Sequence, residues 1–179
     1  MILSRRVFLA AAVALPSLAH AQGGHLYITP KDKWVRVVGV DNAFTVDMPG
    51  IPDRKVLNDV SARGTPFVLN SDSLDEGGNS YVVQTALYPA DVDTRQPRAV
   101  LQAALDVRAQ KLAGGKWSTA NWREVGGATA VESTGALANG SQLRQLSVLK
   151  GQRFISLAFL GPTVTGPDAD RFFRSLKIK

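Results

Sequence analysis

The sequence has no cysteine, only two histidines and 7% aromatic residues in a chain of 179 residues. The absence of cysteine excludes disulfide bonds, thiol nucleophiles and thiolate metal sites. The longest apolar run near the N-terminus covers residues 7–15, whereas a membrane-spanning helix needs roughly 20 residues. With 45% hydrophobic and 20% charged residues, the composition is typical of a globular domain. It excludes a polytopic membrane protein, a collagen-like fibre and a wholly disordered chain.

The first 21 residues have the layout of a secretory signal, with a positive cluster, an apolar run and a small-residue cleavage site. Their start resembles the twin-arginine export signal, although Ala10 stands where that signal prefers lysine. The residues that carry this resemblance are Ser4, Arg5, Arg6, Phe8 and Leu9. Ala19 and Ala21 form the expected cleavage site. We therefore expect export to the periplasm, with an ordinary secretory signal as the alternative route.

Removal of this signal changes the charge balance of the chain. Residues 1–21 contain Arg5, Arg6 and His20 but no acidic residue. The remaining 158 residues hold 19 basic and 15 acidic residues, which corresponds to a net charge of +4. A domain of this size buries roughly 68–70% of its unfolded surface, so it needs no disulfide to remain folded outside the cytoplasm.

The rest of the chain predicts a flexible leader at residues 22–33 and a single α+β domain at residues 34–179. Alternation of apolar and polar residues predicts strands, at residues 34–40, 44–48, 80–88, 117–125, 128–136, 142–149 and 153–160. Residues 53–78 form a polar span with at most a short strand at 66–69. The spacing predicts helices over 97–112 and from Pro167 onward, the second with a cap from Thr165. We expect an antiparallel sheet with two helices packed on it.

The order of these elements resembles the Mog1/PsbP-like superfamily, especially its exported bacterial members. The segments that carry the resemblance are Phe44 to Pro52, Tyr88-Pro89, Gly114-Gly115, the hairpin from Arg144 to Phe154, and Asp168 to Ile178. The resemblance implies a central antiparallel sheet flanked by helices, in a sandwich of two or three layers. It also implies a binding or accessory role, because known relatives are not catalysts.

We identify no catalytic residue. Ser147 and Lys150 match the S-x-x-K spacing, but a strand places residues three apart on opposite faces. His25 is the one histidine left after removal of the signal, and it lies in the glycine-flanked leader, where a catalytic base lacks rigid support. The sequence alone does not pair scattered carboxylates such as Glu124 and Glu132 as an acid and a base.

We also identify no cofactor and no metal site. Residues 70–79 are rich in oxygen ligands, but Leu74 occupies a ligand position of the calcium-binding loop, and we interpret the segment as a solvated loop. Asp93 or Thr94 is interpreted as a cap of the following helix. The paired glycines at 77–78, 114–115 and 126–127 are typical of turns and do not match a phosphate-binding loop.

Basic residues recur every three positions near the C-terminus, at Arg171, Arg174 and Lys177. We interpret them as a solvated helix face that could contact an anionic surface, and we expect no nucleic-acid partner and no transmembrane anchor. The three tryptophans, Trp34, Trp117 and Trp122, are interpreted as core residues, with a ligand pocket as the alternative.

These observations favour an exported periplasmic protein that binds an unknown protein or small molecule in the cell envelope and has no catalytic activity. Two alternatives remain open. One is a small hydrolase or lyase that uses Asp or Glu together with Tyr side chains, and it requires carboxylates that converge with a tyrosine. The other is an envelope-associated structural protein that docks through its basic C-terminal helix.

Overall fold

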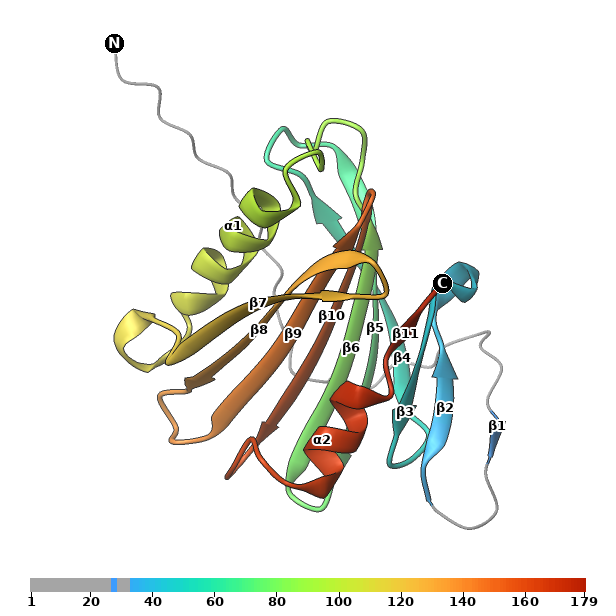
Figure 1. The fold of residues 1–179 in the computed structure, drawn as a ribbon, viewed down its shortest axis with the longest axis vertical. Helices are drawn as coiled ribbons and strands as arrows, with labels where there is room; N and C mark the ends of the chain where they lie inside the picture. The colour runs from blue at the N-terminus through green and yellow to red at the C-terminus, as the bar shows by residue number, and fades with distance from the viewer. Residues whose placement is uncertain (1–26, 29–32) are drawn as a thin grey trace.

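The computed structural model describes residues 27–28 and 33–179. Among these residues, seven antiparallel strands form one sheet in the order β4-β5-β6-β10-β9-β8-β7. The strands are β4 (Asp53–Val60), β5 (Pro66–Glu76), β6 (Asn79–Leu87), β7 (Thr119–Val125), β8 (Ala128–Ala136), β9 (Gln142–Lys150) and β10 (Arg153–Gly161). Figure 1 shows the sheet at the centre of the molecule.

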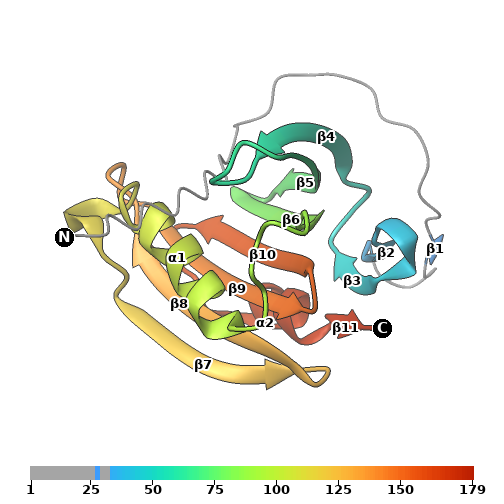
Figure 2. The ribbon, with the colours of Figure 1, turned by 90° about the horizontal axis from the view of Figure 1, so that it is seen from above.

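Helix α1 (Pro97–Ala109) covers one face of this sheet, and helix α2 (Pro167–Arg174) covers the other. A small sheet in the order β1-β2-β3-β11 lies on the same side as α2 (Figure 2). Its strands are β1 (Tyr27–Ile28), β2 (Val35–Val38), β3 (Phe44–Met48) and β11 (Lys177–Ile178). The predicted α+β class, an antiparallel sheet flanked by helices, is confirmed. No helix among the described residues has the length and apolar character needed to span a bilayer.

Strand β10 shows why the sheet needs cover on both sides. Phe154, Ser156 and Ala158 point to the face under α1, and Ile155, Leu157 and Phe159 point to the face under α2. All six residues are buried. We call these two surfaces of the large sheet the α1 face and the α2 face.

The α2 face holds an aromatic core around Tyr81, which is 1% exposed. The ring of Tyr81 makes edge-to-face contacts with Phe159 at 5.1 Å, Phe172 at 5.4 Å and Trp34 at 6.1 Å between ring centroids. Such pairs each contribute about 0.5–1.5 kcal/mol beyond the burial of their surface. Met48 of β3 is also fully buried in this core, so the small sheet is fixed to the large one by apolar packing.

The short strand expected at residues 66–69 is the beginning of β5, but the rest of the prediction that residues 53–78 form a polar span is wrong, because they form the edge hairpin β4–β5. Asn, Asp and Lys have low β-propensity, and the span shows no apolar face. Cross-strand pairing stabilises it instead: Arg54 of β4 donates two hydrogen bonds to the Asp72 carboxylate of β5, at 2.6 and 2.8 Å. The interpretation of residues 70–79 as a loop is wrong for the same reason. The chain turns there only at Gly77 and Gly78, whose φ angles are positive.

Both helices end earlier than predicted. Helix α1 stops at Ala109, and Leu112 is buried beyond it in an isolated bridge to Leu137. Helix α2 stops at Arg174, so Lys177 belongs to β11 and not to a helical stripe of cations.

The expected side-chain caps are also wrong. Gly166, not Thr165, occupies the N-cap position of α2, and no side chain caps it. Gln96 occupies that position in α1, and Asp93 instead accepts hydrogen bonds from Arg95. In both helices a proline at the start of the first turn favours the helical backbone without any cap, because its ring fixes φ.

Candidate functional site

A row of polar side chains crosses the α1 face at the centre of the sheet. The strand register places Ser71 of β5 opposite Gln84 of β6, Gln84 opposite Ser156 of β10, and Ser156 opposite Ser147 of β9. One step along the strands, Gln145 of β9 is opposite Ser133 of β8. Because side chains alternate along a strand, all these residues point to the side of the sheet that α1 covers.

We call this set the polar patch, and all of its members are at least nine-tenths buried. It consists of Ser71, Gln84, Ser133, Gln145, Ser147 and Ser156. A sheet face beneath a helix is ordinarily apolar, because burial of polar groups costs free energy unless they are hydrogen-bonded. The polar patch therefore departs from what packing alone would select.

Two atoms of the polar patch lack any hydrogen-bond partner among the described residues. The side-chain amide of Gln145 donates to Ser147 Oγ at 2.7 Å, but the carbonyl oxygen of Gln145 and the hydroxyl of Ser133 remain unpaired. Leaving a buried polar group unpaired costs about 1–3 kcal/mol. A bound polar ligand or an ordered water would satisfy both atoms.

Apolar contacts hold α1 above the polar patch at both ends. Leu101 and Leu105 of the helix pack with Leu149 and Phe154, on one side of the patch along the strands. Beyond the helix, Leu112 packs with Leu143 and Ala158, on the other side. Ser147 and Gln145 lie between Leu149 and Leu143 on β9, so the segment between Leu105 and Leu112 passes over the polar patch.

Arg108 lies in that segment. It follows Leu101 by seven residues and Leu105 by three, so it is on the helix face that packs on the sheet. The guanidinium of Arg108 has no hydrogen bond or ion pair with any residue that the structure describes. Arg108 keeps part of its surface in contact with solvent, yet burial lowers the pKa of its guanidinium to about 10. Desolvation without a compensating carboxylate explains this direction, because it disfavours the charged form.

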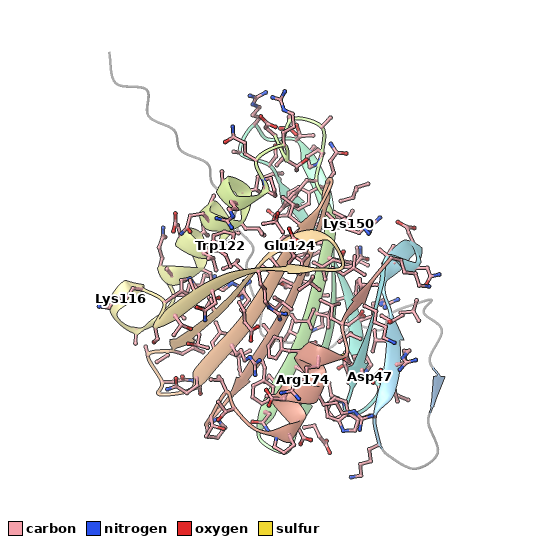
Figure 3. The ribbon with its side chains drawn as sticks, viewed as in Figure 1. Asp47, Lys116, Trp122, Glu124, Lys150 and Arg174 are labelled. Atoms are coloured by element: carbon pink, nitrogen blue, oxygen red, sulfur yellow. The ribbon has the colours of Figure 1, made fainter. Side chains whose placement is uncertain are left out.

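Two tryptophans lie beside α1. Trp117 Nε1 donates to the carbonyl oxygen of Leu105 at 3.0 Å, and the Arg98 guanidinium lies 5.5 Å from the ring centroid of Trp122. Figure 3 shows Trp122 on β7 next to the helix, far from Asp47 and Arg174 on the other side of the molecule. Both rings are only partly buried, whereas Trp34 is a core residue of the α2 face, as expected.

The S-x-x-K pair lies in strand β9, as the alternation predicts. Ser147 belongs to the polar patch, and Lys150 is exposed on the α2 side, where its Nζ donates to the carbonyl oxygen of Lys179. The two side chains therefore do not meet. The predicted export residues, the cleavage site and His25 lie outside the described residues.

The sequence offered carboxylates for a metal site or an acid–base pair. In the structure, several of these carboxylates bind cations or hydroxyls of the described residues. Asp72 binds Arg54, Asp75 accepts a hydrogen bond from Ser80, and Glu132 binds Arg144 at 2.6 Å. Glu124 on β7 and Glu132 on β8 face opposite sides of the sheet, so the two carboxylates do not meet. Within residues 27–28 and 33–179, no three His, Cys, Asp or Glu side chains gather as metal ligands would.

Tyr81 and Tyr88 are both buried in the core. Burial raises the pKa of the Tyr88 hydroxyl far above its ordinary value, with a smaller contribution from Asp59. Burial also raises the pKa of Tyr81, together with the charges of Asp168 and Glu76. Both hydroxyls are therefore harder to ionise than a free tyrosine, which disfavours them as bases or nucleophiles.

Basic residues of α2 are engaged within the fold. The Arg171 guanidinium lies 4.5 Å from the ring centroid of Trp34, and Arg174 pairs with Asp170 at 3.6 Å. Asp168 and Asp170 in the first turn balance these two cations. The helix thus presents less positive charge to a partner than the basic residues of its sequence indicate.

Taken together, the residues define an α+β domain with a buried polar surface under one helix. Its backbone is similar to the solution structure of cyanobacterial PsbP (CyanoP) from Synechocystis sp. PCC 6803, with a TM-score of 0.46 and 13% identity over 92% of this chain and 99% of that chain. No family model matches the sequence. No curated protein matches it either.

Proposed function

We propose that this protein is exported to the periplasm and acts there as a binding or accessory protein without catalytic activity. The observation that carries the proposal is the polar patch, with the unpaired oxygen atoms of Gln145 and Ser133 under α1. These unpaired oxygen atoms do not stabilise the folded state. Natural proteins depart from the rules of packing mainly at functional sites, so we assign ligand binding to this surface.

The polar patch favours a small molecule over a protein as the ligand. Its residues are at least nine-tenths buried on the α1 face, so a flat protein surface would not reach them. Ser hydroxyls and Gln amides can both donate and accept hydrogen bonds. The ligand is therefore a compact polar molecule that makes several hydrogen bonds to the sheet.

The test is a thermal-shift screen of the purified protein against small polar metabolites, repeated with the variant Gln145→Leu. We expect a compound that raises the Tm of the wild type and has no effect on the variant. The matched control is Gln142→Leu, because Gln142 is on the same strand but faces the other side of the sheet. A response that Gln145→Leu leaves intact, or no response to any compound, would contradict the proposed binding site.

Export is tested separately, by replacing both Arg5 and Arg6 with lysine in the full chain. Twin-arginine export depends on this pair, so we expect the double variant to remain in the cytoplasm. N-terminal sequencing of the wild-type protein from the periplasm should begin at Gln22. Normal export of the lysine variant would instead indicate an ordinary secretory signal.

A further inference from the structure

We infer that the ligand of the polar patch is a small carboxylic acid that carries hydroxyl groups, and that Arg108 binds its carboxylate. This inference rests on the proposed binding function and specifies its ligand class. It starts from the position of Arg108 between Leu105, which packs on one side of the polar patch, and Leu112, which packs on the other.

Arg108 is a partly buried cation without an anionic partner among the described residues. None of the ion pairs among the described residues includes it, although arginines elsewhere in the fold, such as Arg54 and Arg144, have carboxylate partners. The lowered pKa of its guanidinium indicates that protein atoms have replaced part of its hydration. A partly desolvated arginine binds an oxyanion through two parallel hydrogen bonds, which is the geometry of carboxylate recognition.

The surroundings favour a singly charged carboxylate over a phosphate. Arg108 lies in the last turn of α1, where the helix dipole places partial negative charge and opposes a doubly charged group. Lys55 of β4, the register partner of Ser71, is a second cation in this row, but it lies at the end of the row farthest from β9, where α1 packs. Every other group in the row is a neutral hydroxyl or amide, and these match the hydroxyl groups of a ligand rather than further charge.

The experiment measures binding through tryptophan fluorescence, because Trp117 is hydrogen-bonded to α1 at Leu105. The probes are gluconate and galacturonate, with sorbitol and galactose as their neutral counterparts and inorganic phosphate as the competing anion. We expect saturable binding of at least one carboxylate, and binding at least tenfold weaker for its neutral counterpart and for phosphate. The arginine supplies charge-assisted hydrogen bonds, so Arg108→Met should weaken carboxylate binding by about tenfold to a hundredfold.

Two controls separate a binding role of Arg108 from a structural one. Lys111→Met removes the same charge from an exposed position just beyond α1 and should leave binding unchanged. In the absence of ligand, Arg108→Met should raise the Tm by about 2–4 °C, because it removes an unpaired, partly buried cation. A lower Tm would show that Arg108 stabilises the fold and would overturn the inference.

The outcomes distinguish this inference from the proposed function. If neutral polyols bind as tightly as the acids and Arg108→Met binds normally, the polar patch is a binding site but the carboxylate inference is wrong. Tighter binding of phosphate than of any carboxylate would also overturn it. If no probe binds to the wild type, the inference fails, and the wider metabolite screen decides the proposed function independently.

Discussion

The two faces of the large sheet differ in whether their charged and polar side chains have partners. On the α2 face, aromatic rings pack around Tyr81, and Arg144 binds the carboxylates of Glu132 and Asp170. On the α1 face, Arg108 lacks such a partner among the described residues, and two buried oxygen atoms are unpaired. The difference indicates that the α2 face supplies stability and that the α1 face gives up stability for a site that can bind.

The largest expected effect is on the α2 face, from Phe172→Ala. Phe172 is fully buried against Tyr81 and Phe173, and truncation of a buried phenylalanine costs about 3–5 kcal/mol. Urea denaturation followed by circular dichroism measures the loss. The control is Val56→Ala, at a residue that is 62% exposed, which should change the free energy of unfolding by less than about 0.5 kcal/mol. Equal losses in the two variants would contradict the assignment of the stabilising core.

The second prediction sets the two arginines against each other. Arg144→Met should lower the free energy of unfolding by about 1–3 kcal/mol, because it leaves Glu132 and Asp170 without their shared partner. The same substitution at Arg108 should have the opposite sign. Denaturant titration of both variants without ligand gives the comparison directly, and the contrast between the two faces is lost if both variants are destabilised alike.

The third prediction concerns the polar patch, through Gln145→Leu. Leucine has a similar size and removes the unpaired carbonyl oxygen, so we expect the free energy of unfolding to rise by about 1 kcal/mol. The variant also loses the donor to Ser147 Oγ, which limits the gain. A loss of stability comparable to that of Phe172→Ala would show that Gln145 is a structural residue. The α1 face would then be an ordinary core.

The strand pattern predicted most of the sheet. The bounds of β3 and β8 agree with the structure to the residue, because each strand alternates in polarity and has a clear stop at one end, Pro49 after β3 and Gly126-Gly127 before β8. The hairpin β4–β5 could not be predicted in this way. Its stability comes from pairing with β6 and from the bond between Arg54 and Asp72, which depend on the register of residues far apart in the sequence.

Only part of the candidate site could be predicted from the sequence. The alternation in β10 already placed Ser156 between Phe154 and Ala158 on one face, which is a polar residue where an apolar one is expected. Helical spacing from Leu101 and Leu105 places Arg108 on the buried face, but the prediction considered only the apolar members of that face. The unpaired state of Gln145 and Ser133 could not be predicted, because it depends on which side chains α1 brings above the sheet.

The smallest expected effect is a pH dependence that belongs to the α2 face alone. The hydrogen bond from Arg144 lowers the pKa of Asp170 below its ordinary value of 3.8, with further contributions from the charges of Arg144 and Arg174. A carboxylate with a lowered pKa stabilises the fold fully above its unfolded pKa, and this contribution is lost as the pH falls through the folded value. The Tm difference between wild type and Asp170→Asn should therefore be constant above about pH 5 and shrink below about pH 4. The control is Asp106→Asn, which removes an exposed carboxylate of α1 that accepts a hydrogen bond from Gln102. The same pH dependence of the Tm difference in both variants would mean that the ion pairs of the α2 face add nothing to stability. The difference between the two faces of the sheet would then depend on the aromatic core alone.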